Sequence, residues 1–121
     1  MRQGEVYFAE LDPVRGSEQQ GTRPVVILQS DLVSRYIART AVVAPFTSSQ
    51  VEKYRKFPTC VFVPAGVGGL RSDSVALGHQ IRTIDRSRLK QRLGSLPDEF
   101  LAELEQAIAF TLQILERSND S

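Results

Sequence analysis

GEVYFAELDPVRGSEQQGTRPVVIL, residues 4–28, is the stretch that decides the fold. Residues 5–11 alternate polar and apolar side chains and include two aromatics, which predicts a β-strand that ends at Asp12-Pro13. Residues 24–29 are a short β-branched run, which predicts a buried strand. The polar segment between them, residues 14–23, contains two glycines and predicts a loop. The chain therefore opens with two strands joined by a long polar loop.

Further short segments have the β-branched or aromatic composition of strands: residues 40–47, 59–63, 74–84 and 91–94. Pro45 should lie at an edge or bulge, and Gly78 at a bend. Residues 30–39 are mixed in composition and read as one helical turn, and residues 48–58 read as a polar loop. These connections are too short for crossover helices between parallel strands. We therefore expect a mainly β fold with α, a small twisted β-barrel followed by a C-terminal helix.

The C-terminal helix is expected at about residues 96–117, and it is acidic and amphipathic. Ser95 and Asp98 have the spacing of a capping box, and Pro97 suits a first helical turn. Apolar residues recur at helical spacing: Leu101, Leu104, Ile108, Leu112 and Leu115. The net charge of +1 divides into +6 over residues 1–97 and −5 over residues 98–121. We expect the partner-facing charge on the basic body, although scattered surface arginines beside a solvated acidic helix would give the same numbers.

Length and composition exclude several classes of protein. The 121 residues fit one domain, which we expect to span residues 1–121. Cys60 is the only cysteine and His79 the only histidine, so neither a disulfide nor a Cys/His zinc site is expected, and no metal or cofactor is implied. The sequence has no signal-peptide core and no run of about 18 apolar residues, so we expect a cytoplasmic protein. Motifs of serine hydrolases, P-loop enzymes and zinc proteases are absent.

Arg23 is the strongest candidate for chemistry in the polar loop. It precedes Pro24, whose ring favours an extended backbone at the residue before it. A planar guanidinium that is always charged suits a phosphate and the charge that develops on it during reaction. The alternative is a surface ion pair between Arg23 and Glu18.

Other polar groups have both a functional and an ordinary interpretation. Thr47 ends a predicted strand and is followed by two serines, so three hydroxyls either donate to phosphate or make a turn. His79 is a candidate acid or base because imidazole exchanges protons near neutral pH, but it is equally a packed side chain. Tyr36, Tyr54 and Phe57 lie in polar segments beside basic residues, where aromatics either stack on bases or pin the loop.

Three segments taken together resemble the MazF/PemK family of toxin endoribonucleases over nearly the whole chain. They are residues 4–28, quoted above, residues 44–49 (APFTSS) and residues 73–89 (DSVALGHQIRTIDRSRL). The resemblance implies an SH3-like β-barrel of the MazF/CcdB type, a homodimer, and a cognate antitoxin with an acidic flexible segment. It also implies sequence-specific, metal-independent and ribosome-independent cleavage of single-stranded RNA. Attack by the 2′-hydroxyl would leave 2′,3′-cyclic phosphate and 5′-hydroxyl ends, and cleavage of mRNA would inhibit translation and growth.

The same resemblance assigns residues of this chain. The family's catalytic Arg and Thr fall on Arg23 and Thr47, and the acidic residue of its loop falls on Glu18. The expected RNA-binding residues are Ser17, Gln19, Ser48, His79 and Gln80. His79 departs from the family, in which many members carry an acidic residue before the Gln. Because Arg23 is a poor base, the acceptor of the 2′-hydroxyl proton stays open between Glu18, His79 and a deprotonated Arg23.

Two other functions fit the same fold class. CcdB-like gyrase poisons depend on a C-terminal tail with a tryptophan, but this chain has no Trp. A catalytically dead RNA- or antitoxin-binding member is disfavoured because both Arg23 and Thr47 are present. The RNA sequence that is cut depends on loop shape and contacts with unstacked bases, which the sequence does not give.

Overall fold

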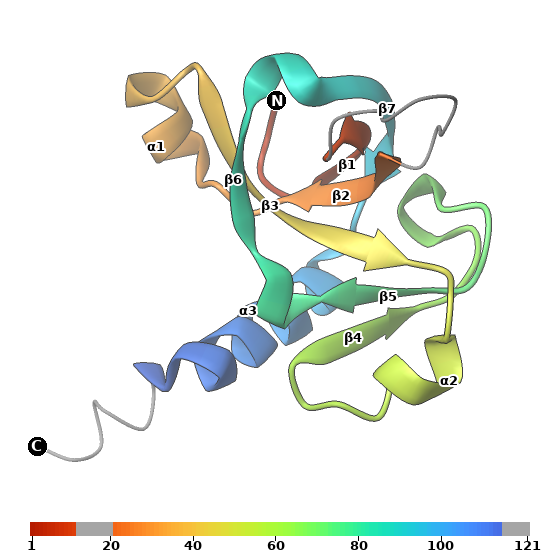
Figure 1. The fold of residues 1–121 in the computed structure, drawn as a ribbon. Helices are drawn as coiled ribbons and strands as arrows, with labels where there is room; N and C mark the ends of the chain where they lie inside the picture. The colour runs from red at the N-terminus through yellow and green to blue at the C-terminus, as the bar shows by residue number, and fades with distance from the viewer. Residues whose placement is uncertain (12–20, 115–121) are drawn as a thin grey trace, which may run out of the picture.

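The computed structural model describes residues 1–11 and 21–114, which form a sheet and a C-terminal helix (Figure 1). The strands are β1 (Glu5–Glu10), β2 (Thr22–Ile27), β3 (Thr40–Thr47), β4 (Cys60–Val63), β5 (Ser74–Leu77), β6 (Arg82–Asp85) and β7 (Leu89–Ser95). The helices are α1 (Asp31–Tyr36), α2 (Val51–Tyr54) and α3 (Asp98–Leu112), with 3₁₀ turns η1 (Val67–Gly69), η2 (Gly78–Gln80) and η3 (Arg86–Arg88).

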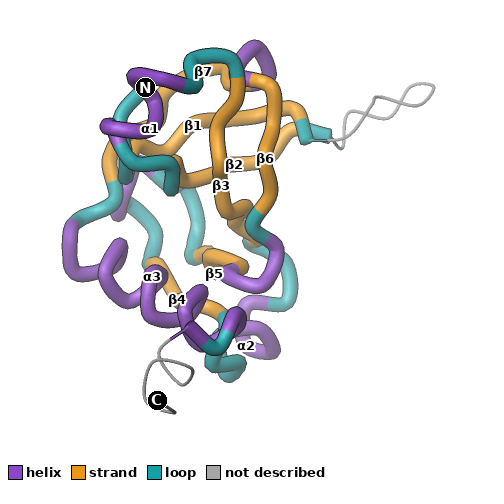
Figure 2. Tube along the Cα trace, turned by 90° about the vertical axis from the view of Figure 1, so that its left-hand side faces the viewer, coloured by secondary structure: helices purple, strands orange, loops and turns teal. Residues whose placement is uncertain are grey.

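All strand pairings are antiparallel, in the order β4-β5-β3-β2-β1-β7, with β6 also paired to β3. Figure 2 shows β1, β2, β3, β6 and β7 in the upper part of the molecule, and β4 and β5 near α3 below. The mainly β fold with a C-terminal helix is thus confirmed. No pairing among the described residues closes the sheet, so the term barrel applies only loosely.

Strand β3 joins the two parts of the sheet. Its residues 40–43 pair with β6, and its residues 46–47 pair with β5. Pro45 lies between these two stretches, buried in a central strand rather than at the expected edge or bulge. Proline has no N–H to donate. It is tolerated here because β3 changes its paired strand from β6 to β5 at this point.

The central strand β2 is buried on both faces. Val26 packs with Phe46 and with Leu104 of α3 in one hydrophobic cluster. Val25 and Ile27 point the other way, into a second cluster. Successive strand residues face opposite sides, so burial on both sides needs an unbroken apolar run. The buried strand expected at residues 24–29 is confirmed.

Helix α3 begins at Asp98 and ends at Leu112, so it is shorter than the expected 96–117. The Ser95 capping box is wrong: Pro97 is the N-cap without a side-chain cap, and Ser95 Oγ accepts a hydrogen bond from Arg92 at 2.9 Å. Strand β7 continues through Ser95, which takes this residue out of reach of the helix. Of the expected apolar stripe, Leu104 is fully buried, Leu101 and Ile108 are partly buried, Leu112 is exposed, and Leu115 lies outside the described residues.

Three local expectations need correction. Residues 48–58 contain the short helix α2, which follows Gln50 in the left-handed region at φ 56°. The last strand, expected at residues 91–94, extends over Leu89–Ser95. His79 lies in the turn η2 and not within a strand. Cys60 is buried, which confirms it as a small core residue.

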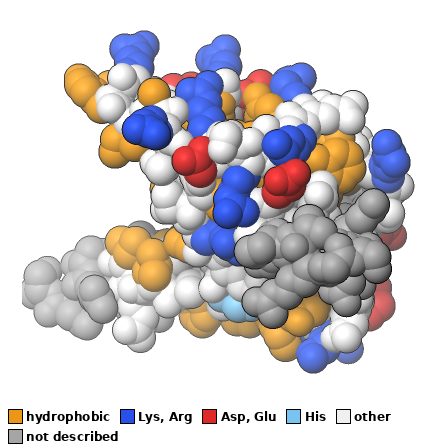
Figure 3. Space-filling model, turned by 45° about the horizontal axis from the view of Figure 1, so that its top comes forward, with side chains coloured by type: hydrophobic (Ala, Val, Ile, Leu, Met, Phe, Trp, Pro, Cys, Tyr) orange, Lys and Arg blue, Asp and Glu red, His pale blue; other side chains and the backbone are white. Residues whose placement is uncertain are grey.

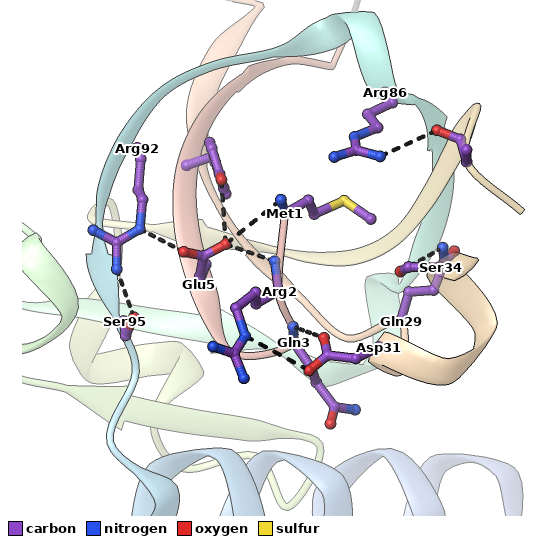
Figure 4. A network of polar contacts seen from close by, with 12 residues as sticks. Met1, Arg2, Gln3, Glu5, Gln29, Asp31, Ser34, Arg86, Arg92 and Ser95 are labelled. Carbon is purple, nitrogen blue, oxygen red and sulfur yellow. Dashed lines mark hydrogen bonds and ion pairs between the residues drawn. The ribbon is translucent and has the colours of Figure 1, made fainter.

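A polar network around Glu5 ties the N-terminus to β7 (Figure 4). The Glu5 carboxylate accepts hydrogen bonds from the Arg2 backbone N–H at 2.6 Å, from Arg92 Nε at 2.6 Å and from the Tyr7 hydroxyl at 3.2 Å. The Met1 amine lies 4.0 Å away. Burial alone would raise the pKa of Glu5, but these donors together lower it below its ordinary value.

Candidate functional site

The register between β2 and β3 brings two strand ends together. Val25 pairs with Pro45, Val26 with Ala44, and Ile27 with Val43. Continued two residues toward the polar loop, this register sets Arg23 opposite Thr47. Both side chains are half-buried, and both line the same two neighbouring pockets.

The larger pocket has a volume of about 360 Å³. Its apolar lining comes from Phe8, Pro24, Phe46, Leu70 and Leu93, and its polar lining from Thr22, Arg23, Thr47, Ser48, Ser49, Arg71, Ser72 and Ser74. Two guanidinium groups among several hydroxyls suit an anionic group such as phosphate, because charge-assisted hydrogen bonds are the strong ones.

The smaller pocket, of about 230 Å³, lies on the other side of the same residues. It is lined by Arg23, Thr47, Ser49, Gln50, Tyr54, Leu77 and Gln80. Arg23, Thr47 and Ser49 line both pockets and therefore form their common boundary. Tyr54 offers an aromatic surface there and packs edge-on against Phe57, with ring centroids 5.7 Å apart.

The Thr47 hydroxyl makes a local turn with Ser49. It accepts a hydrogen bond from the Ser49 N–H at 3.2 Å and donates to the Ser49 carbonyl at 3.3 Å. The turn chemistry weighed as one alternative is therefore present. The long donating bond can be exchanged for one to a bound anion without changing the strand.

The ends of the polar loop are joined by a backbone hydrogen bond of 2.7 Å from the Leu11 N–H to the Gly21 carbonyl. Two guanidiniums, one from β6 and one from η3, reinforce this stem. Arg82 donates to the Leu11 carbonyl at 3.1 Å, and Arg88 donates to the Glu10 carbonyl at 3.2 Å. Arg23 therefore lies two residues after Gly21, whose position these hydrogen bonds fix.

Basic side chains are spread over the face of the molecule in Figure 3, with fewer acidic ones between them. Residues 1–11 and 21–114 contain no group of three His, Cys, Asp or Glu side chains arranged to hold a metal ion. None of the helices in these ranges is both long and apolar enough to cross a membrane.

A family model for the PemK-like, MazF-like toxin of type II toxin–antitoxin systems matches residues 2–112. The chain belongs to this family. Endoribonuclease EndoA of Bacillus subtilis is 42% identical over 116 residues, which cover 96% of this chain and 97% of EndoA. Endoribonuclease MazF of Staphylococcus saprophyticus is 46% identical over 112 residues, which cover 93% and 91%. A MazE–MazF crystal structure from Deinococcus radiodurans has a TM-score of 0.74 at 26% identity and covers 94% of this chain and 96% of that one.

The expected resemblance to the MazF/PemK family is confirmed, and this protein is a toxin of a type II toxin–antitoxin system. Its curated relatives are named as endoribonucleases.

The structure brings together four of the eight expected site residues of the toxin. Arg23, Thr47 and Ser48 line the larger pocket, and Gln80 lines the smaller one with Arg23 and Thr47. His79 lines neither of these two pockets and lies behind Gln80. The other three, Ser17, Glu18 and Gln19, lie outside the described residues.

Sequence reasoning missed five polar residues that line the two pockets: Thr22, Gln50, Arg71, Ser72 and Ser74. Arg71 was passed over within a glycine-rich connection, although an arginine in a loop between strands is a usable signal. Gln50 lies within the polar loop predicted at residues 48–58 and carries no signal of its own. Of the three aromatic candidates, Tyr54 lines the smaller pocket, whereas Tyr36 lies on α1 with 82% of its surface exposed.

Proposed function

We propose that this toxin is a metal-independent, ribosome-independent endoribonuclease that cleaves single-stranded RNA at a preferred sequence, with Arg23 and Thr47 as catalytic residues. The observation that carries the proposal is that these two side chains form the boundary between two pockets. A scissile phosphate at this boundary would have one neighbouring nucleotide in each pocket. The names of the curated relatives as endoribonucleases support this reading.

The reaction needs donors and a base, and no step requires a metal. A base removes the 2′-hydroxyl proton, the 2′-oxygen attacks the adjacent phosphorus, and the bond to the 5′-oxygen breaks. The leaving 5′-oxygen takes up a proton from water, and the products are a 2′,3′-cyclic phosphate and a 5′-hydroxyl. The Arg23 guanidinium stabilises the negative charge on the pentacoordinate phosphorus and assists the leaving oxygen. The Thr47 hydroxyl donates to a non-bridging oxygen when it exchanges its bond to the Ser49 carbonyl.

Glu18 is our first candidate for the base that accepts the 2′-hydroxyl proton, with a deprotonated Arg23 as the alternative. His79 is less suited to this role because both ring nitrogens already have neighbours. Nδ1 lies 3.1 Å from Thr59 Oγ1, and Nε2 lies 3.5 Å from the Gln80 amide. A base must reach the proton that it removes.

Substrate contacts are proposed on both sides of the phosphate. Ser48 and Arg71 in the larger pocket suit the RNA backbone, and Gln80 in the smaller pocket suits a base edge. Tyr54 is a surface on which that base can stack. Ser17 and Gln19 of the polar loop are proposed as further RNA contacts from their positions in the motif.

The toxin is also proposed to form a homodimer and to be inhibited in the cytoplasm, where mRNA is available, by an antitoxin with an acidic flexible segment. Membership of a type II toxin–antitoxin family supports the antitoxin. Acidic side chains can occupy the positions of RNA phosphates beside Arg23 and Arg71. Sedimentation at micromolar concentration tests the dimer, and loss of cleavage on adding the partner tests the inhibition.

The deciding experiment is incubation of purified toxin with a long single-stranded RNA in EDTA, followed by mapping of both new ends. We expect discrete cuts with 5′-hydroxyl ends, which a polynucleotide kinase labels without prior phosphatase treatment. Activity that EDTA abolishes and Mg²⁺ restores would refute the metal-free mechanism. RNA binding without cleavage would instead identify a catalytically dead binding member.

A further inference from the structure

Three side chains form a line from the start of β4 to the smaller pocket. Thr59 Oγ1 lies 3.1 Å from His79 Nδ1, and His79 Nε2 lies 3.5 Å from Gln80 Nε2. Gln80 then lines the smaller pocket together with Arg23 and Thr47. Thr59 and His79 line neither this pocket nor the larger one, and Gln80 is the one of these three residues that reaches the site.

The backbone holds the two ends of this line at a fixed separation. The Gly78 N–H donates to the Thr59 carbonyl at 2.9 Å, which joins η2 to the residue before β4. A Cβ at position 78 would lie 2.4 Å from that carbonyl oxygen, so only glycine allows the approach. Thr59 is half-buried, whereas His79 and Gln80 are exposed. The Thr59 hydroxyl is therefore held in place by its surroundings, whereas the exposed His79 imidazole is free to rotate.

Hydrogen-bond chemistry links the orientation of one member to that of the next. A side-chain amide nitrogen only donates, so His79 Nε2 must be the acceptor in its contact with Gln80. In the neutral tautomer that fits this contact the proton is on Nδ1, which lies 3.1 Å from Thr59 Oγ1 and 3.7 Å from Cys60 Sγ, with the hydroxyl as the nearer acceptor. With its NH₂ turned to His79, Gln80 has its Oε1 free to accept: none of the described residues donates to that oxygen.

We propose that Thr59, acting through His79, is a positioning residue that sets which atom of the Gln80 amide the substrate meets. Held as described, Gln80 presents an acceptor to the smaller pocket. An acceptor at this point pairs with the exocyclic amino group of adenine or cytosine, whereas the O4 carbonyl that uracil carries at the same ring position as the cytosine amino group cannot donate to it. The inference rests on the proposed endoribonuclease function and assigns one element of its sequence preference.

Removal of the Thr59 hydroxyl tests this positioning. Thr59→Val keeps the shape and removes the nearer partner of Nδ1, which leaves only the weakly accepting Cys60 Sγ at 3.7 Å, so the imidazole and the Gln80 amide can both turn. Thr59→Ser restores the hydroxyl. Thr83→Val is the matched control, because Thr83 lies on β6 and lines neither pocket.

The readout is the ratio of cleavage between two oligonucleotides that differ only at the base beside the cut, identified first by sequencing the ends from a randomised RNA pool. We expect Thr59→Val to reduce the preference for the amino-bearing base about tenfold, the order of one good base contact. Thr59→Ser and Thr83→Val should keep the wild-type ratio. An unchanged ratio in Thr59→Val would overturn the proposal, as would a ratio that Thr59→Ser fails to restore.

A second variant covers the case in which Thr59→Val does not fold. His79→Leu removes both ring nitrogens at an exposed position and should by itself change the ratio by the same amount. Where Thr59→Val does fold, the double variant should show no further change. Additive effects, or no effect of His79→Leu, would overturn the inference. No cleavage of any RNA by the wild type is a different outcome, which refutes the proposed function itself.

Discussion

Arg23 and Thr47 stand opposite each other at the ends of β2 and β3, because the register that pairs Val25 with Pro45 continues to them. Together they form the boundary between the two pockets of this face. A pair that lies 24 positions apart in the sequence thus becomes one site. The first predictions concern this pair.

Arg23→Ala should lower the rate of RNA cleavage by about 10²–10³, the usual cost of removing a donor aimed at transition-state charge. The matched control is Arg39→Ala, because Arg39 is an exposed arginine just before the opposite end of β3 from Thr47. Initial rates on one defined oligonucleotide, with circular dichroism to verify folding, provide the measurement. Similar losses in both variants would reduce the site to a generic basic surface.

Arg23→Lys should also lose most of the activity, although it keeps the positive charge. An ammonium lacks the planar fork of donors that binds two phosphate oxygens at once. The comparison is kcat for this variant against Arg23→Ala under the same conditions. Near-normal cleavage would show that charge alone suffices at this position.

Tyr54→Leu should weaken RNA binding about tenfold while it keeps an apolar side chain against the core, because stacking contributes on the order of 1–3 kcal/mol per base. Tyr36→Leu is the control, since Tyr36 is 82% exposed on α1 and lines neither pocket. Fluorescence anisotropy with a non-cleavable 2′-deoxy substrate measures the two affinities. Equal affinities in the two variants would exclude stacking on Tyr54.

Glu5→Gln should lower the free energy of unfolding by about 2 kcal/mol, since charge-assisted hydrogen bonds contribute more than neutral ones. The pKa of Glu5 is lower in the folded protein than in the unfolded chain. This contribution is therefore fully present above the unfolded pKa and is lost as the pH falls through the folded pKa.

Urea unfolding over a series of acidic pH values tests the Glu5 network. The difference in stability between wild type and Glu5→Gln should be largest near neutral pH and should shrink on acidification. Glu10→Gln is a suitable control, because Glu10 is exposed and its nearest cation, Lys90, lies 3.9 Å away. A difference that is constant with pH would show that the carboxylate charge contributes nothing.

Local patterns were enough to predict most strands and the mainly β class. The apolar run of β2 predicted burial on both faces, and the pre-proline position singled out Arg23. These features depend on side-chain periodicity and backbone restriction within a few residues, so the sequence alone carries them. The match of three separate motifs was likewise enough to predict the MazF/PemK family, which the family comparison confirms.

The contacts between residues far apart in the sequence were decided by the tertiary structure. The strand ladder chose Thr47 as the neighbour of Arg23, and the fold brought Arg71 to the same pocket from a loop that looked like a plain connection. The extension of β7 removed Ser95 from the start of α3. His79 contacts Thr59 and Gln80 and lines neither pocket. Register and side-chain contacts follow from packing the whole chain at once, and for that reason no window of the sequence contains them.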